Sequence, residues 1–187
     1  MRIAAIFSVT ALLIGCSQPA AKPNPSDQIS VTKVWSTSNV VKTNNKYLRL
    51  QPVFKGGKIF TANANGNVYA LDAKTGDVLW RNKTSTPISS GVSVSKNNVF
   101  VGTAFGNLIA FDQNTGGRSW FQSFESGLLA TPSISRGVVA TASMSGQISA
   151  YRASNGHLLW NQEVMAPALA LRISGQAAVA GNKFIVP

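Results

Sequence analysis

The 187-residue sequence predicts an all-β fold built from repeats of about forty residues, and three observations support this. The first is that matching Gly, Ala and Trp residues recur forty positions apart, with no insertion between the copies. They are Gly66, Gly106 and Gly146, then Ala70, Ala110 and Ala150, then Gly76, Gly116 and Gly156, and finally Trp80, Trp120 and Trp160. The second is that each period contains four short runs of β-forming residues separated by turn residues. The third is that no sustained apolar pattern of helical period occurs outside the N-terminal segment.

The second repeat shows the four expected strands most clearly. Strands are predicted at 91–95, 99–104, 108–112 and 119–124, because these runs alternate or are rich in β-forming residues. The residues between them, which include Gly-Asn and Gly-Gly pairs and a cluster of Lys and Asn, are typical of tight turns. The third repeat follows the same order over 131–164, and the first over 51–83. Four antiparallel strands per period, with Trp and Gly at fixed positions, predict the blades of a β-propeller.

Both edges of the repeat array are incomplete. Residues 31–38, VTKVWSTS, match only the last strand of a blade, with Trp35 in the place of Trp80, and such a strand would close the final blade of a ring. Residues 181–187, GNKFIVP, match the second strand of a fourth blade. The sequence therefore predicts three full blades, part of a fourth and an N-terminal closing strand, too few for a ring. We expect a truncated propeller whose unpaired edges favour aggregation.

The first fifteen residues have the features of a secretion signal. Arg2 precedes an apolar run over 3–14 that is too short to span a bilayer and that leads into Gly15-Cys16. Small residues before a cysteine resemble the bacterial lipoprotein signal, so residues 1–15 are expected to be removed and Cys16 to carry lipid. An ordinary secretory signal cleaved elsewhere is the alternative. Residues 16–30 are then a flexible tether rich in Pro, Ser and Ala, and 31–187 form the partial propeller.

Composition and charge limit the class of protein. The chain is 44% hydrophobic and 12% charged, as expected of a folded globular protein. Its 17 Lys and Arg residues against 6 Asp and Glu give a net charge of +11, which favours an anionic membrane surface or an acidic partner. Cys16 is the only cysteine, so no disulfide framework is expected. No nucleic-acid partner is expected either, because an exported protein rarely meets one.

The repeated residues are predicted to be structural. In the stretch ALDAKTGDVLW, Asp72 and Thr75 can bond the turn backbone, Gly76 permits a positive φ, and Trp80 buries a large ring. A catalytic residue is expected once in a chain, whereas this set occurs three times.

The third copy of the unit supports the same interpretation. Arg152 and Asn155 stand where the other copies have Asp and Thr, a change that a turn tolerates but a general acid or metal ligand does not. The only histidine, His157, lies in a predicted turn with no acid or nucleophile partner. We therefore predict no catalytic residue, no metal and no cofactor.

The unit A-x-D-x-x-T-G-x-x-x-W, present at 70–80 and 110–120 and altered at 150–160, resembles the repeat of quinoprotein-like eight-bladed propellers. The chain also has a lipoprotein-type signal ending at Cys16, a tether, KVWSTS at 33–38 and PALALR at 167–172. With these features the sequence is similar to the BamB family, lipoproteins of the outer-membrane β-barrel assembly machinery. The resemblance covers about the N-terminal half of a family member. It implies a non-catalytic scaffold that supports the folding and insertion of barrel proteins. Ser17 after the cysteine implies an anchor at the periplasmic face of the outer membrane.

The resemblance also implies a partner contact. Family members bind BamA through a loop with a Leu-x-Leu-Arg motif and through acidic residues further along their chains. The motif here is Leu169, Leu171 and Arg172, which we expect to contact the periplasmic domains of BamA. The acidic residues fall beyond this sequence. From spacing alone, the two leucines fit one face of a buried strand equally well.

Two alternatives remain at this stage. One is a propeller lipoprotein of the envelope that binds another protein, a peptide or a glycan. The other, which is less favoured, is a relative of the quinone-dependent dehydrogenases, which use the same repeat but need a quinone pocket with calcium. Unfolded outer-membrane proteins are a further possible partner, through exposed strand edges.

Overall fold

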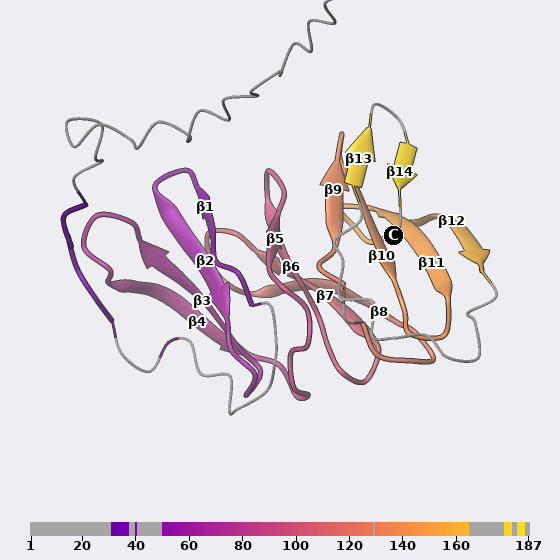
Figure 1. The fold of residues 1–187 in the computed structure, drawn as a ribbon, viewed down its shortest axis with the longest axis horizontal. Helices are drawn as coiled ribbons and strands as arrows, with labels where there is room; N and C mark the ends of the chain where they lie inside the picture. Colours follow the sequence, from indigo (N-terminus) through magenta and orange to yellow (C-terminus); the bar gives the residue numbers. More distant parts are fainter. Residues whose placement is uncertain are drawn as a thin grey trace, which may run out of the picture. The chain divides into compact units, whose positions relative to one another are not determined.

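The strands of the protein form three four-stranded sheets and one hairpin (Figure 1). The computed structural model describes residues 31–37, 40, 50–128, 130–164, 178–180 and 183–185, and within these residues it contains fourteen strands and no helix. No membrane-spanning helix occurs in this part of the chain. The chain divides into two units, Met1–Thr32 and Lys33–Pro187, and every described strand belongs to the second. The predicted all-β fold is confirmed.

Each four-stranded sheet is an antiparallel meander in which consecutive strands are neighbours, as in a propeller blade. The first blade contains β1 (Val53–Lys55), β2 (Lys58–Ala62), β3 (Asn67–Asp72) and β4 (Val78–Lys83). The second contains β5 (Ser93–Val94), β6 (Asn98–Gly102), β7 (Asn107–Asp112) and β8 (Arg118–Ser123). The third contains β9 (Ser133–Ser135), β10 (Val138–Ala142), β11 (Gln147–Arg152) and β12 (Leu158–Glu163), and a hairpin of β13 (Ala178–Ala180) and β14 (Lys183–Ile185) follows.

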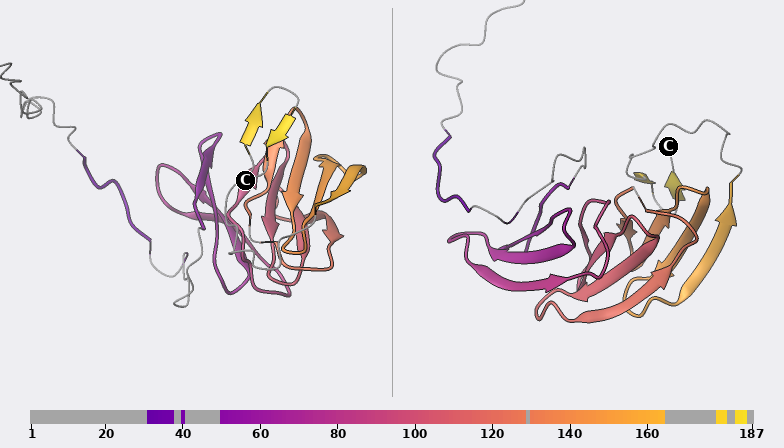
Figure 2. Two further views of the ribbon diagram at one scale, coloured as in Figure 1. Left: turned by 45° about the vertical axis from the view of Figure 1, so that its right-hand side comes forward. Right: turned by 90° about the horizontal axis from the view of Figure 1, so that it is seen from below.

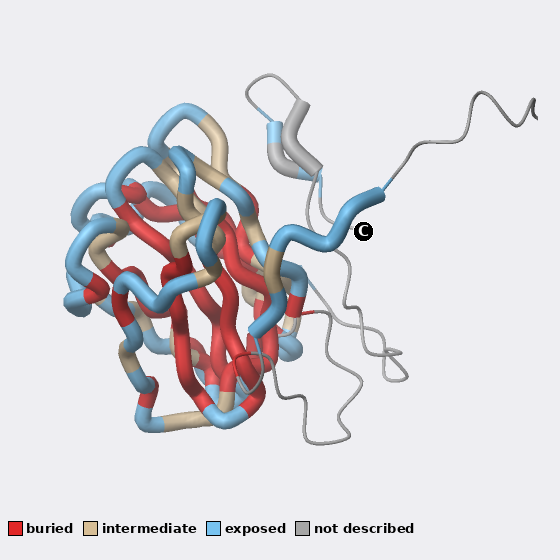
Figure 3. Tube along the Cα trace, turned by 90° about the vertical axis from the view of Figure 1, so that its left-hand side faces the viewer, coloured by how far each residue is buried: buried red, intermediate tan, exposed pale blue. Residues whose placement is uncertain are grey.

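The blades pack against each other through two apolar clusters. One joins the first and second blades and includes Phe60, Val99 and Val101, while the other joins the second and third and includes Phe100 and Val139. Because successive residues of a strand point to opposite faces, β6 contributes to both clusters and is buried on both sides. Figure 2 shows the sheets following one another along the chain, and Figure 3 shows the buried segments concentrated along the strands.

The first strands of successive sheets also lie beside one another. Strand β1 contacts β5, β5 contacts β9, and β9 contacts β13. The hairpin β13–β14 therefore continues the series as the first two strands of a further blade, and the predicted partial fourth blade is confirmed.

A bulge occurs at the same place in every blade. In the first blade Ala70 pairs with Trp80 and Leu71 pairs with Val78, which leaves Leu79 as the extra residue. The second and third blades shift register after Ala110 and Ala150 in the same way. A bulge re-aims the side chains that follow it, so the repeated bulge gives each tryptophan the same direction.

The tryptophan that ends one segment binds the turn between the third and fourth strands of the next blade. The indole Nε1 atoms donate hydrogen bonds to backbone carbonyls of that turn, from Trp35 to Ala73 (3.0 Å), from Trp80 to Gln113 (3.0 Å) and from Trp120 to Ala153 (3.2 Å). The ring of Trp80 lies directly on Gly116, where an added Cβ would lie 2.6 Å from its Cδ2 atom. Gly76 and Gly156 are covered in the same way by Trp35 and Trp120.

The N-terminal segment makes this docking contact without forming a strand. Residues 31–37 have no assigned strand, although Trp35 occupies the position on Gly76 that Trp80 occupies on Gly116. A strand requires backbone hydrogen bonds to a neighbour, whereas this segment is held through an indole side chain. Its role in closing another blade stays a prediction.

Replacing the glycine under a tryptophan is expected to destabilise the fold more than replacing a glycine in open space. Gly116 and Gly57 have similar φ values of 72° and 74°, but a Cβ at Gly57 meets nothing within 4 Å. Gly57→Ala carries only the backbone cost, about 1 kcal/mol, whereas Gly116→Ala adds the collision with Trp80 and costs about 3 kcal/mol. Urea unfolding of both variants measures the difference. Equal losses of unfolding free energy in the two variants would show that the indole ring of Trp80 does not require a residue without a Cβ beneath it.

Candidate functional site

The turn between β3 and β4 is closed by its own Asp and Thr side chains. Asp72 Oδ1 accepts hydrogen bonds from the N–H groups of Lys74 (2.8 Å) and Thr75 (3.0 Å), and Thr75 Oγ1 accepts one from Asp77 (3.3 Å). The second blade repeats the arrangement with Asp112, which binds the N–H groups of Asn114 (2.9 Å) and Thr115 (2.8 Å). These carboxylates therefore hold the turn backbone, which is a structural role.

The same hydrogen bonds lower the pKa of both carboxyls below the ordinary value of 3.8. The backbone N–H of Thr75 has the largest effect on the pKa of Asp72, and that of Thr115 on the pKa of Asp112. A carboxyl with a lowered pKa stays ionised at neutral pH, whereas a general acid needs a raised pKa. The repeated Asp residues are thus unsuited to proton donation.

The third blade closes the equivalent turn without a carboxylate. Asn155 Oδ1 accepts a hydrogen bond from the N–H of His157 (3.1 Å), as Thr75 does in the first blade. The backbone N–H of Gly156 donates to the carbonyl of Arg152 at 2.8 Å, and the N–H of Arg152 donates to the carbonyl of His157 at 2.8 Å. The turn keeps its shape, so the position of Arg152 does not require an Asp.

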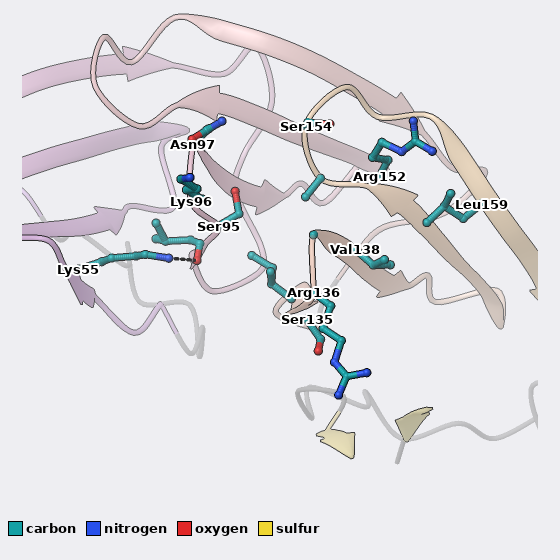
Figure 4. A pocket seen from close by; sticks show the side chains of 14 residues that line it. Lys55, Ser95, Lys96, Asn97, Ser135, Arg136, Val138, Arg152, Ser154 and Leu159 are labelled. Carbon is teal, nitrogen blue, oxygen red and sulfur yellow. Dashed lines mark hydrogen bonds between the residues drawn. The ribbon is translucent and has the colours of Figure 1, made fainter. Parts of the chain in front are cut away.

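A groove of about 780 Å³ lies where short turns of all three blades meet (Figure 4). Lys55, at the end of β1, comes from the first blade, and Lys96, from the β5–β6 turn, comes from the second. Arg136, from the β9–β10 turn, and Arg152, at the end of β11, come from the third. We call this surface the cationic groove. In Figure 4 the two lysines lie at one end and the two arginines at the other.

Among the residues that the structure describes, those that line the cationic groove include four cations and no Asp or Glu. Lys55 Nζ donates a hydrogen bond to the carbonyl of Val94 at 3.4 Å, which ties its side chain to the second blade. The apolar lining residues are Val94, Ile134, Val138, Ala153 and Leu159, and three serines add hydroxyl groups. A concave surface lined by one sign of charge raises the local concentration of ligands of opposite charge.

Arg136 occupies an unusual backbone conformation. Its φ of 46° makes it the only non-glycine residue with positive φ in the part of the chain that the structure describes. The corresponding turn of the first blade has Gly56, with φ 58°. Side chains with a Cβ are disfavoured in this region, and such residues occur at functional sites more often than elsewhere.

The residues predicted to carry the function lie outside the described part of the chain: Cys16, Leu169, Leu171 and Arg172. The repeated glycines Gly66, Gly106 and Gly146, which lie in the turns between second and third strands, have φ of 88°, 81° and 90°. Trp160, in β12, is 40% exposed, compared with 8% for Trp80. The described His, Cys, Asp and Glu residues form no group of three or more suited to a metal ion.

Sequence reasoning did not identify the cationic groove. Two signals were available, because Lys96 and Arg136 occupy the same position of the repeat, and because Arg152 reverses the charge of Asp72 and Asp112. Neither signal shows that the four cations face one groove, since that depends on how the blades pack.

Antiparallel four-stranded blades tied by docked tryptophans define a repeat protein of the propeller class. The chain belongs to the family described as outer membrane protein assembly factor BamB, whose model matches residues 30–90 and 64–187.

Similar curated proteins carry the same description. The chain is 33% identical over 98 residues to the outer membrane protein assembly factor BamB of Pseudomonas aeruginosa. The aligned region covers 49% of this chain and 26% of that protein. It is 35% identical over 109 residues to the BamB of Yersinia pestis, 48% of this chain and 28% of that protein. The matches therefore span only 26% and 28% of the length of these relatives.

Solved structures share the fold. The crystal structure of BamB from Moraxella catarrhalis has a TM-score of 0.54 and 19% identity, covering 67% of this chain and 41% of that one. A quinohemoprotein alcohol dehydrogenase from Pseudomonas putida has a TM-score of 0.52 and 26% identity, covering 59% of this chain and 19% of that one. The fold is thus common to an assembly factor and to dehydrogenases, and does not by itself identify the activity.

Asp112→Asn is expected to reduce the loss of stability in acid. Because the folded-state pKa of Asp112 is lowered, its contribution is fully present above the unfolded value near 3.8 and is lost as the pH falls through the folded value. Asn cannot ionise, so the variant loses less unfolding free energy between about pH 6 and about pH 3. Urea unfolding at both pH values tests this, with Asp77→Asn as a control of equal charge change. A pH dependence identical to that of the parent protein would contradict the assignment.

Proposed function

We propose that the protein is a non-catalytic scaffold of the outer-membrane protein assembly complex that docks on the periplasmic domains of BamA. The observation that carries the proposal is the family match over residues 30–90 and 64–187. The curated relatives named above are called assembly factors, which supports the same role. Folding and insertion of outer-membrane barrel proteins would be the process that the scaffold serves.

The blade array suits a scaffold because its side chains are used to hold the fold. The repeated Asp, Thr, Gly and Trp residues bind turns and neighbouring blades. Rigid sheets with variable connections between them are a common way to present binding loops. A dehydrogenase activity, which the quinohemoprotein likeness raises as an alternative, has no further observation in its favour.

The proposed BamA contact consists of Leu169, Leu171 and Arg172. In sequence these residues fall between β12 and β13, in the connection that leads from the third blade to the partial fourth. Arginine is enriched at interface hot spots and is a directional cationic donor, and the two leucines beside it would add apolar surface to bury.

The proposed location is the periplasmic face of the outer membrane. Lipid on Cys16 would provide the anchor, and residues 16–30 would provide the tether between the anchor and the blades. Removal of Arg2 with residues 1–15 leaves 16 Lys and Arg against 6 Asp and Glu, and this net charge of +10 is suited to an anionic membrane surface.

Exposed strand edges are a second proposed contact, for unfolded barrel proteins. Every residue of β12, at the edge of the third blade, is exposed. Strands at the edge of a sheet can add an extended chain to the sheet.

Leu171→Ala combined with Arg172→Ala is expected to weaken association with BamA by about tenfold or more, because two hot-spot side chains are removed. Co-purification of BamA with the full chain from cells measures this, and a photo-crosslinker at Leu171 checks for direct contact. The matched control is Leu79→Ala with Arg81→Ala, two exposed residues of β4. Equal association of both double variants with BamA would refute the proposed contact.

A further inference from the structure

The cationic groove has the properties of a binding site for a peptide. We propose that it binds an extended segment of a partner protein in which acidic and apolar side chains alternate. The groove residues differ from Leu169, Leu171 and Arg172, so this inference does not rest on the proposed BamA contact. It adds a second interaction surface, built from turns of the three blades.

The first argument is charge. Lys55, Lys96, Arg136 and Arg152 line a single groove, and none of the described residues that line it is an Asp or Glu. Like charges that gather without a carboxylate among them repel one another, and an anionic ligand would relieve this repulsion. Because the four cations come from three blades, a ligand that reaches all of them must extend across the blades, as a peptide does and a single small anion does not.

The second argument is that Arg152 departs from the repeat. Arg152 stands where Asp72 and Asp112 hold their turns, and the third blade keeps the Asn155 and backbone bonds whose counterparts also occur in the first blade. Of the three residues at this repeat position, only Arg152 lines the groove, and it carries a positive charge where Asp72 and Asp112 carry a negative one. A turn alone does not favour Arg over Asp, whereas an anion site does.

The backbone conformation of Arg136 is a further argument. It occupies a backbone conformation with φ 46° at which the first blade has Gly56. Glycine adopts this conformation without steric cost, so an arginine here makes the turn less stable than it need be. Arg136 lines the groove, and a guanidinium group can bind a carboxylate through two parallel hydrogen bonds.

The apolar lining favours a peptide over phosphate or a lipid headgroup. Val94, Ile134, Val138 and Leu159 lie among the cations. An extended peptide directs alternate side chains to opposite sides, and neighbouring positions can then meet an apolar surface and a cationic rim. Backbone groups of such a peptide would find hydrogen-bonding partners in Ser135 and Ser154.

The test uses the full chain and a fluorescent peptide of about ten residues in which Glu and Val alternate. Fluorescence anisotropy at about 50 mM salt gives its affinity, and a Lys/Val peptide of the same length is the charge control. The key variant combines Arg136→Gly with Arg152→Asp, which restores residues found at the matching positions of the first blade. Because Gly suits the backbone of residue 136 and Asp suits the turn at residue 152, we expect it to unfold no earlier than the parent.

The expected result is that the parent binds the Glu/Val peptide and not the Lys/Val peptide. The groove variant should bind at least about tenfold more weakly. A control with the same change in net charge, Arg81→Asp with Lys83→Gln on exposed positions of β4, should stay within about twofold. Lys96→Ala, a second exposed groove residue, should weaken binding about threefold and provides an independent variant.

Several results would overturn the proposal. One is that the parent protein does not bind the Glu/Val peptide. Another is that the groove variant and its charge-matched control lose the same affinity for the peptide, which would show that net charge alone determines binding. Displacement of the peptide by inorganic phosphate at equal concentration would assign the groove to a small anion. Tighter groove-dependent binding to phosphatidylglycerol vesicles than to the peptide would assign it to lipid headgroups.

Discussion

The contact between each tryptophan and the turn of the following blade limits how the rest of the structure can vary. The indole ring needs a bare glycine beneath it, and its N–H needs a carbonyl of the same turn, as Trp80 finds in Gly116 and Gln113. A side chain on the glycine would displace the ring, and an unpaired indole N–H would be costly where it is buried. The spacing of Gly and Trp is therefore fixed, and the bulge before each tryptophan is fixed with it.

Positions outside this contact are free to change from blade to blade. The third blade keeps the Asn155 and backbone hydrogen bonds of its turn although Arg152 replaces the Asp of the other blades, so the turn tolerates a change at this position. In a repeat protein each unit contacts mainly its neighbours, so one blade can acquire a binding residue without disturbing the others. The fold is shared with a BamB crystal structure and with a quinohemoprotein alcohol dehydrogenase, and a shared fold does not by itself determine function.

The sequence predicts the blades well because their determinants are local and repeated. Alternating strands, turn residues and the forty-residue spacing of Gly and Trp are visible without knowledge of packing. The segment 31–37 was harder to predict, because whether an extended run forms a strand depends on a neighbour that its own residues do not specify. The cationic groove was missed for a related reason: Lys55 and Arg136 are far apart in sequence, and only the packing of three blades brings them to one surface.

The most direct test of the central claim, that the tryptophan and the glycine beneath it stabilise the array as one unit, is a double-mutant cycle. Urea unfolding of the full chain would be measured for Trp120→Leu, Gly156→Ala and the double variant. An added Cβ at Gly156 would lie 2.7 Å from the Trp120 ring, so removing the ring should lower the cost of Gly156→Ala by at least about 1 kcal/mol. Costs that add to within about 0.3 kcal/mol would contradict the account, because they would show that ring and glycine contribute independently.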